Sequence, residues 1–488
     1  MMRGGDFLRF FWEVSNNCIE PNVRNHDESL ISDKKWYPYF KGGTFRRWYG
    51  NRTYVVDYLH DGEHVREGDR NPSIYFKDNI NWSKISSGLF SARKGEEGAL
   101  YDDAACQCYV FDNSNYNVIL GLLNTKYAQQ ILWCMSQTYN YISSEVSKIP
   151  ISLERSVLGN INYIVGYNVQ LSKLDWDYHE PSWDFQTNPL VALLKAAECK
   201  DFSDIDQISL QNRPNRNAKQ AESEAKTVHI ASQNGPFCNT ADNQDVTESV
   251  SNNGCKDISW CSDSEQSRHD YLTSMIRLSE MIESNEHQGK VGTLELAVEA
   301  FKSLWTARFL QLHANEEELN RQFIDIYGLQ DELTPDVPLK EITILQNGEI
   351  SVDGDNINWH DDVLMKQLIS YLIGCSMGRY AIEKPGLIIA NQGETIDDVH
   401  KQVAEPTVDV DDDGIIPVLD GDYFPDDATE RIKKALRNVF GSEYNSNDRR
   451  YGGVSVGMDI RSYMAKHFYS DQSQMYKKSP LYRMFTTK

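Results

Sequence analysis

The sequence predicts an α+β protein in which a mixed N-terminal region is followed by a mainly helical C-terminal region. Over residues 1–165, short strand-like runs such as Tyr54–Tyr58 and Ser73–Phe76 alternate with turns that contain glycine or proline. After residue 267 the apolar residues recur at helical spacing instead. Residues 201–266 lie between the two parts and are rich in Asn, Gln, Ser, Asp and Glu without sustained periodicity. Such a composition buries too little apolar surface to offset chain entropy, so we expect a mobile insertion or linker there.

These patterns divide the chain into consecutive segments, and a length of 488 residues suits two to four domains. We expect an α+β region over 1–165, a connecting segment over 166–200, the insertion over 201–266, a helical segment over 267–330 and a mainly helical region over 331–488.

Individual elements follow from spacing and from capping residues. Apolar residues at helical spacing predict one amphipathic helix over Tyr116–Met135, and Ile149–Ile151 looks like a short strand after it. A later apolar face, Leu319, Phe323, Ile326 and Tyr327, predicts a helix that ends at Gly328. Two further helices are expected over Met365–Met377 and from an Asp426 cap to Gly441.

Composition excludes several classes of protein. Hydrophobic residues make up 40% and charged residues 25% of the chain, as in an ordinary soluble protein. No apolar run approaches the roughly 20 residues that span a bilayer, and the first residues do not form a secretory signal. The nine cysteines show no CxxC pairs, which favours reduced thiols. We therefore expect a cytoplasmic protein without a membrane partner.

The segment Lys34–Arg52, called the basic segment below, differs from the rest of the chain. It reads KKWYPYFKGGTFRRWYGNR, with six basic residues, seven aromatic residues and no acid, in a protein whose formal net charge is −23. Basic groups interleaved with flat rings suit a phosphate backbone and its bases. An aromatic core segment with snorkelling basic side chains explains the same composition. Strong overall acidity argues against general nucleic-acid binding but is compatible with a focused basic cleft.

A second polar segment lies about thirty residues later. It reads WSKISSG from Trp82 to Gly88 and is followed by Phe90 and Arg93. Hydroxyls, a lysine and a glycine between apolar anchors suit phosphate contacts. An ordinary polar turn between two core anchors explains the same residues, but proximity to the basic segment suggests that the two form one surface.

Two patterns resemble metal sites. The carboxylates of Asp409, Asp411, Asp413 and Asp420, with Gly414, match the spacing of a calcium loop. Against calcium, the last ligand is Asp instead of Glu, Pro417 lies inside the loop, and residues 402–430 hold ten acids without a Lys or Arg, as in a solvated acidic loop. The set Cys238, Cys255, Cys261 and His269 lacks the spacing of zinc modules. We expect no metal at either place.

No catalytic motif is found in the sequence. Methyl transfer to a base amine needs an NPP(Y/F)-type tetrad and a glycine-rich cofactor loop, and neither occurs. The phosphate loop GxxxxGK(S/T), the GxSxG elbow and HExxH are also missing. We therefore assign no catalytic residue and no bound cofactor to this chain.

The order of several blocks resembles a known family. The blocks KWYPYFKGGTFRRWYGN, NPSIYFKDNINWSKISSGLFSAR, ILGLLNTK and KIPI resemble the target-recognition region of large adenine-specific DNA methyltransferases. The later blocks EEELNRQFIDIYGLQDELTPDVP, LISYLIGCSMGRY, KPGLI, DDDGIIPVLDGDYFPDD and YKKSPLYRMF resemble the C-terminal part of the same proteins. The methyltransferases that these blocks resemble are the PglX enzymes of the BREX phage-defence system. PglX enzymes are related to fused type II restriction–modification enzymes.

The resemblance implies a function for the basic segment. In such enzymes a domain that binds S-adenosylmethionine precedes the recognition region, so this chain is expected to supply recognition of double-stranded DNA. The expected DNA-binding residues are Lys41, Gly42, Gly43, Arg46, Arg47, Trp48, Tyr49, Asn51, Lys84 and Ser86. The glycines would let the backbone approach a phosphate, and Trp48 and Tyr49 would position the segment. The resemblance does not imply a calcium role for the DDDG block.

The resemblance also leaves the partners open. The methyltransferase catalytic domain would be separate or missing, as in one half of a split enzyme or in a truncated coding sequence, and other BREX proteins are expected partners. The alternatives are a non-enzymatic acidic scaffold of the defence complex and an inactive fragment.

Overall fold

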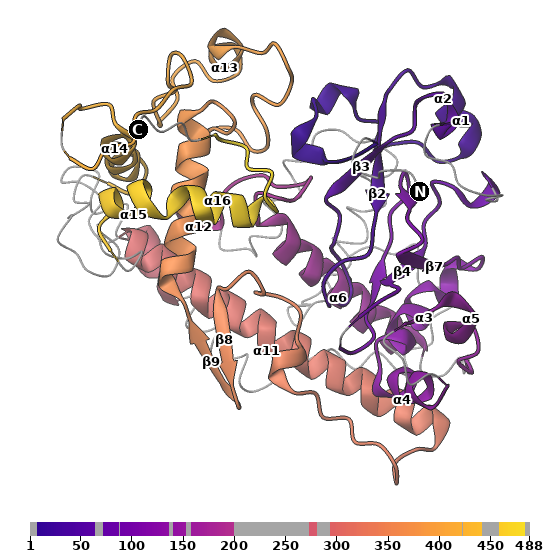
Figure 1. Ribbon diagram of the computed structural model, residues 1–488. Coiled ribbons are helices and arrows are strands. Elements are labelled where there is room, and N and C mark those ends of the chain that lie inside the picture. The colour runs from indigo at the N-terminus through magenta and orange to yellow at the C-terminus, as the bar shows by residue number, and fades with distance from the viewer. Residues whose placement is uncertain are drawn as a thin grey trace, which may run out of the picture.

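The computed structural model of the chain is shown in Figure 1. The residues that it describes are 7–63, 72–86, 88–135, 140–152, 158–199, 273–280, 293–421, 423–441 and 458–483. The α+β class predicted from the sequence is confirmed, since small sheets in the N-terminal part are followed by helices that make up most of the rest. The insertion expected over 201–266 lies outside the described residues.

The first sheet is built from β1 (Leu8–Phe10), β3 (Tyr54–Asp57), β2 (Trp36–Phe40) and β6 (Leu100–Tyr101), in that spatial order. Strand β3 is antiparallel to both β1 and β2, and β6 is parallel to β2. Because side chains alternate between the two faces of a strand, paired residues lie on one face. One face packs Tyr37 and Val56 into a small core of their own.

The second sheet lies next to the first and has the order β5 (Ala92–Lys94), β4 (Ile80–Ser83) and β7 (Ala105–Cys108), all antiparallel. An isolated bridge between Trp48 and Arg93 joins the basic segment to its edge. A separate hairpin, β8 (Ile350–Asp353) and β9 (Asn356–Trp359), turns at Gly354, where φ is 59°.

The remaining regular structure of the described fold is mainly helical. Their bounds are α1 (His26–Ile31), α2 (Leu59–Gly62), α3 (Tyr116–Leu123), α4 (Lys126–Met135), α5 (Ser143–Val146), α6 (Leu158–Asp177), α7 (Pro189–Glu198), α11 (Thr293–Tyr327), α12 (Asp361–Ser376), α13 (Ile396–Gln402), α14 (Ala428–Phe440), α15 (Ile460–Lys466) and α16 (Phe468–Met475).

Helix α11 connects the two parts of the molecule. It is 35 residues long, or about 50 Å at the α-helical rise, and crosses the molecule from the C-terminal helices to α4. At one end Thr293 donates to the carbonyl of Phe440, which closes α14. Near the other end the Asn320 side chain accepts from the first backbone N–H of α4, on Lys126, at 2.9 Å. One hydrophobic core therefore runs from Trp82 in the second sheet to α14 and α15.

The expected helix over Tyr116–Met135 is two helices, and the reason is a polar side chain. Asn124 donates to and accepts from the backbone of Ala92 in β5, at 3.0 and 2.8 Å. Gln129 in α4 accepts from the backbone N–H of Phe90 at 2.6 Å. These bonds satisfy the open edge of β5, and Asn124 leaves helical geometry to make them. Apolar periodicity carries no information about such a partner.

Three smaller expectations are also corrected. Ser73–Phe76 is not a strand: Pro72, with its fixed φ, begins a 3₁₀ turn over Pro72–Ile74. Residues 149–152 form no strand. The cap of α14 is Asp427, whose side chain accepts from the N–H of Glu430 at 2.9 Å, and not Asp426.

Other expectations are met. Helix α11 ends at Tyr327, and Gly328 follows with φ of 64°, a left-handed conformation that suits glycine. Helix α14 is followed by Gly441 at φ of 108°. The boundary expected at residue 165 lies within the continuous helix α6, and the division into domains stays a prediction. None of the helices in the described ranges has the length and apolarity needed to cross a membrane.

Candidate nucleic-acid interface

The two segments that the sequence suggested as one surface are neighbours. After β2 the chain turns at Gly42, with φ of 79°, where an added Cβ would lie 2.8 Å from the carbonyl oxygen of Ala104. Ser83 at the end of β4 donates from its hydroxyl to the carbonyl of Gly43 at 3.0 Å. Lys84 and Ser86, which follow Ser83, thus lie near the Gly42–Gly43 turn in the middle of the basic segment. Glycine is required at position 42 because the turn is left-handed and tight.

The arginines of the basic segment point into the protein. Arg46 pairs with Asp175 of α6 and donates from Nε to the carbonyl of Tyr49 at 3.0 Å. Arg47 pairs with Glu316 of α11 and, at 3.2 Å, with Glu341. Both arginines are buried, with 3% and 7% of their surface exposed. Each therefore acts as a buried bridge between the basic segment and a helix.

Trp48 and Tyr49 are buried even more fully, at 1% exposure each. The indole of Trp48 donates to Glu316 at 2.7 Å, so Glu316 accepts from two consecutive residues of the basic segment. The hydroxyl of Tyr49 donates to Glu96 at 2.6 Å, and burial raises its pKa. The positioning role expected for these two rings stays a prediction.

Arg93 holds the basic segment from the other side. It is fully buried, and within the described ranges it forms no ion pair with a carboxylate. Its guanidinium donates to the carbonyl of Arg46 at 3.3 Å and to the hydroxyl of Ser83 at 3.2 Å. Burial, with the positive charge of Arg46, lowers the pKa of Arg93 to about 10. Arg93 therefore ties β4, β5 and the basic segment together.

The ten residues expected to bind DNA fall into two groups. The buried group, which offers no side chain to a phosphate in this conformation, is Gly42, Arg46, Arg47, Trp48, Tyr49 and Asn51. The side chain of Asn51 closes the loop by donating to the carbonyl of Thr44 at 3.0 Å. The group at the surface is Lys41, Gly43, Lys84 and Ser86. Lys84 pairs with Asp103 at 2.8 Å. DNA contact by these residues stays a prediction, and burial with internal partners does not favour it for Arg46, Arg47 and Asn51.

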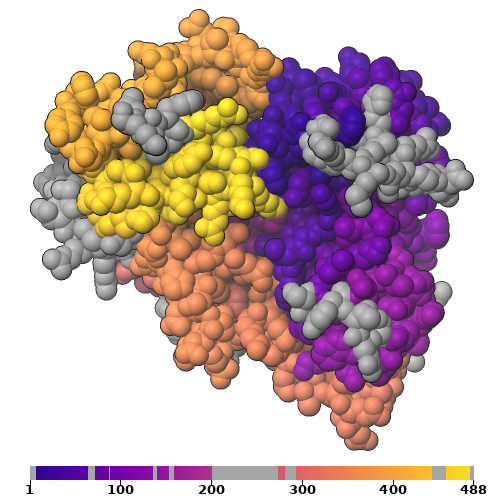
Figure 2. All heavy atoms as spheres, viewed as in Figure 1, coloured from indigo at the N-terminus to yellow at the C-terminus, as the bar shows by residue number. Residues whose placement is uncertain are grey.

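Sequence reasoning missed a C-terminal contribution to this surface. The segment after α16 meets the N-terminal strands, as the contact between yellow and indigo atoms in Figure 2 shows. There the ammonium of Lys477 donates to the hydroxyl of Thr53 at 3.1 Å and lies 5.6 Å from the ring centre of Tyr54. The ammonium of Lys41 lies 5.9 Å from the same ring. The signal was the basic and aromatic block YKKSPLYR, which the sequence places far from the basic segment.

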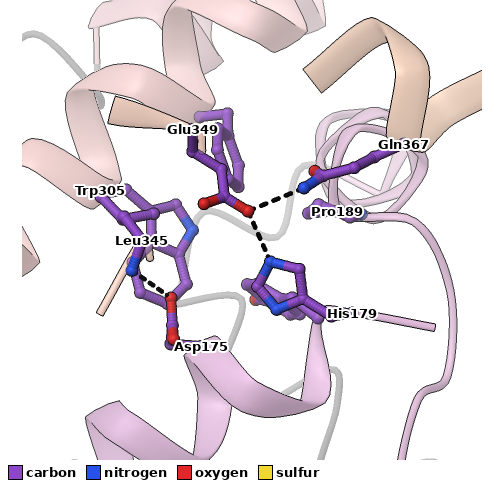
Figure 3. Close-up of a pocket in the computed structure, with 9 residues that line it drawn as sticks. Asp175, His179, Pro189, Trp305, Leu345, Glu349 and Gln367 are labelled. Atoms are coloured by element: carbon purple, nitrogen blue, oxygen red, sulfur yellow. Dashed lines mark hydrogen bonds and ion pairs between the residues drawn. The ribbon is translucent and has the colours of Figure 1, made fainter. Parts of the chain in front are cut away.

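A small cavity lies between α6, α7, α11 and α12 and is drawn in Figure 3. Its volume of about 10 Å³ suits one water molecule. His179 and Gln367 both hydrogen-bond to Glu349 at 2.7 Å, and Asp175 accepts from the backbone N–H of Leu345 at 2.8 Å. S-adenosylmethionine does not fit this cavity, and the sequence contains no glycine-rich cofactor loop. The absence of a bound cofactor, expected from the sequence, stays a prediction.

The acidic loop uses its carboxylates within the protein. Asp409 pairs with Lys434 and Asp411 pairs with Arg431 of α14. The second oxygen of Asp411 also accepts from the backbone N–H of Ile415 at 3.0 Å. Across the described ranges, no three His, Cys, Asp or Glu side chains gather as a metal site would need. The set Cys238, Cys255, Cys261 and His269, where no metal was expected, lies outside those ranges.

The chain is similar over nearly its whole length to a class of enzyme, the adenine-specific methyltransferases. One relative is the adenine-specific methyltransferase BrxX of Escherichia coli O9:H4 (strain HS), with 24% identity over 99% of this chain and 33% of the relative. Another is the adenine-specific methyltransferase PglX of Lacticaseibacillus casei (strain Zhang), with 28% identity over 99% of this chain and 32% of the relative. No protein-family model matches the chain.

The chain spans about a third of the length of the curated relatives that it matches. The resemblance drawn from the sequence is thus confirmed at the level of adenine-specific methyltransferases. That the matching third is their recognition part stays a prediction.

Replacing Arg47 with Met is expected to destabilise the protein strongly. Among the described residues, Trp48 is then the one hydrogen-bond partner left to Glu316, which is buried at 3% exposure, and loss of one member of a buried pair costs about 3–5 kcal/mol. Chemical denaturation followed by tryptophan fluorescence measures the loss.

The matched control is Arg24→Met, because Arg24 is exposed and its side chain makes no ion pair among the described residues. We expect this variant to stay within about 0.5 kcal/mol of the unmodified protein. Equal stability of the two variants would contradict the assignment of Arg47 as a buried bridge.

The buried pair of His179 and Glu349 predicts a dependence of stability on pH. Burial alone would lower the pKa of His179, but the charge of Glu349 and the bond to it outweigh burial and raise this pKa. Burial alone would raise the pKa of Glu349, but His179 and its hydrogen bonds lower it. The stabilisation that His179 contributes is complete below its unfolded pKa of about 6.5 and is lost as pH rises through its pKa in the folded protein. The stabilisation that Glu349 contributes is complete above its unfolded pKa of about 4.3 and is lost as pH falls through its pKa in the folded protein.

We therefore expect His179→Gln to lower the melting temperature most near pH 6 and progressively less as pH rises above the folded pKa of His179. Differential scanning fluorimetry from pH 5 to 9 measures the difference, with the exposed His400→Gln as control. A difference that does not change with pH would show that His179 is not charged in the folded protein.

Proposed function

We propose that this chain is the DNA-recognition portion of a site-specific adenine DNA methyltransferase that acts in phage defence. The observation that carries the proposal is the extent of the similarity. It covers 99% of the chain but only a third of each relative, and this third contains neither the NPP(Y/F)-type tetrad nor a glycine-rich cofactor loop. Methyl transfer from S-adenosylmethionine to the exocyclic amine of adenine would then be carried out by a catalytic domain outside this chain, after base flipping.

The surface of Lys41, Gly43, Lys84 and Ser86 supports a DNA contact. Gly43 and Ser83 join the two segments by a hydrogen bond, so their basic residues lie on neighbouring loops. The loop itself is held by buried ion pairs, which gives the lysines a rigid base. Acidic residues elsewhere would suppress non-specific binding, because like charges repel the phosphate backbone. Double-stranded DNA is the expected partner, with other proteins of the defence system as further partners.

Duplex binding should depend on the surface lysines. With a random-sequence library of 40-base-pair duplexes, we expect the bound fraction to be enriched in a shared sequence. The double variant Lys41→Gln, Lys84→Gln should bind more weakly, and the slope of log affinity against log salt should become shallower by about two, at about 0.9 per phosphate contact. Fluorescence anisotropy and sequencing of the bound fraction provide the two measurements.

The matched control is Lys401→Gln on α13. Lys401 is 72% exposed and pairs with Asp398, so the variant removes the same charge from a distant surface. We expect its affinity and salt slope to be unchanged. The proposal fails if no sequence is enriched, or if the double variant binds the duplex as well as the unmodified protein does.

A second candidate, an acidic scaffold that contacts other proteins, is favoured by one observation. The acidic loop carries exposed apolar side chains, with Ile415 and Tyr423 at 72% and Phe424 at 57% exposure. Exposed apolar groups of this kind occur at protein–protein contacts. The scaffold would show no enrichment of a DNA sequence in the experiment above.

A further inference from the structure

Three aromatic rings form a column at one end of the first sheet. Phe10 stacks on Trp12 with ring centres 4.7 Å apart and on Tyr54 with ring centres 4.8 Å apart. The pairing of Phe10 with Tyr54 across β1 and β3 sets this arrangement. Trp12 is the buried end, and its indole donates to the carbonyl of Ser479 at 2.9 Å. Phe10 and Tyr54 remain partly exposed. The column therefore begins in the core and ends at the surface.

Two lysines from distant parts of the chain lie next to the exposed part of the column, Lys41 near Tyr54 and Lys477 beside Phe10 and Tyr54. The ammonium of Lys41 is 5.9 Å from the ring centre of Tyr54. The ammonium of Lys477 is 5.6 Å from the ring centre of Tyr54 and 5.8 Å from that of Phe10. Lys477 is exposed, but desolvation by the neighbouring groups lowers its pKa. The two positive charges thus flank one aromatic surface.

These lysines differ in their partners from two other lysines of the N-terminal sheets. Lys35 pairs with Asp57 and Lys84 pairs with Asp103. By contrast, no carboxylate of a described residue forms an ion pair with Lys41, Lys477 or the adjacent Lys478. Glu13, next to the column, accepts a hydrogen bond from the backbone N–H of Phe10 at 2.8 Å. In a chain of net charge −23, lysines without an acidic partner around exposed rings are suited to an external anion.

The backbone fixes the position of the C-terminal lysines. Lys477 and Lys478 have φ of 51° and 68°, a left-handed conformation that is uncommon for residues other than glycine. The N–H of Lys478 donates to the carbonyl of Ser473 at 2.6 Å, and that of Ser479 donates to Tyr476 at 2.9 Å. Strained backbone of this kind persists where the surrounding structure holds it, often at functional sites. The lysines are thus presented from a fixed turn.

We propose that this column and its lysines bind single-stranded DNA, with an unpaired base stacked on Tyr54 and the neighbouring phosphates on Lys41 and Lys477. A base has a flat face that extends the column, and stacking on aromatic side chains is tolerant of sequence. The Lys41 ammonium exchanges its contact with the ring for a phosphate as the base enters. The inference rests on the proposed function in that it takes DNA as the ligand, and it adds a second mode of contact to duplex recognition.

The experiment compares the full chain and its variants in binding a 5′-labelled, mixed-sequence 12-nucleotide single strand by fluorescence anisotropy. We expect Tyr54→Leu to weaken binding about tenfold, since stacking of one base on an aromatic ring is lost. Tyr54→Phe keeps the ring and should bind as the unmodified protein does. Lys41→Gln and Lys477→Gln should each make the salt slope shallower by about 0.7.

The matched control is Lys35→Gln. Lys35 lies over a ring as well, 5.2 Å from the centre of Trp36, but pairs with Asp57 at 3.4 Å. Its replacement should leave affinity and salt slope unchanged. Circular dichroism and melting temperature establish whether each variant is folded. If Tyr54→Leu does not fold, Lys477→Gln, a change at the surface, still tests the inference.

The inference is overturned if the unmodified chain does not bind the single strand, or if Lys477→Gln binds it as Lys35→Gln does. Its failure is distinct from failure of duplex recognition. Sequence-selective duplex binding without single-strand binding removes only the inference. Single-strand binding that depends on Tyr54 and Lys477, without duplex selectivity, supports the inference and removes the proposed function.

Discussion

The fold depends on two adjacent buried arginines and the carboxylates that neutralise them. Arg46 reaches Asp175 of α6, and Arg47 reaches Glu316 of α11. Because an unpaired buried charge costs several kcal/mol, each pair fixes the N-terminal sheets against a long helix. Asp175 also holds the backbone of Leu345, so the same interaction extends to the loop before β8. Hydrophobic contact alone would leave the relative position of these elements less well defined.

This use of basic residues shapes the surface that remains. All three arginines of the basic segment, Arg46, Arg47 and Arg52, serve internal ion pairs, and the exposed positive charge comes from a few lysines. In a strongly acidic protein, a few exposed lysines over aromatic rings form a local positive site without general attraction to polyanions. Such a distribution is compatible with selective contact to nucleic acid. The same segment thus supplies both the buried arginines of the rigid interior and a lysine of the surface site.

Elements with a local cause were predictable from the sequence. Helices α11 and α14 stop just before Gly328 and Gly441, because glycine adopts the required backbone conformation whatever surrounds it. Strand β3 follows from its β-branched and aromatic residues. The break between α3 and α4 was not predictable in this way, since Asn124 leaves the helix to bond a strand that is distant in sequence. Apolar periodicity indicates which face of a helix is buried, but it does not indicate that Asn124 bonds to the backbone of a distant strand.

The sequence by itself determined the α+β class, the family resemblance and the unusual composition of the basic segment. Only the tertiary structure decided which of its residues face solvent. The acids that neutralise Arg46 and Arg47 come from helices more than one hundred residues away, and Lys477 reaches Tyr54 from the other end of the chain. Charge and aromatic content are local properties of a sequence, whereas burial and ion pairing depend on which distant segments the fold brings together.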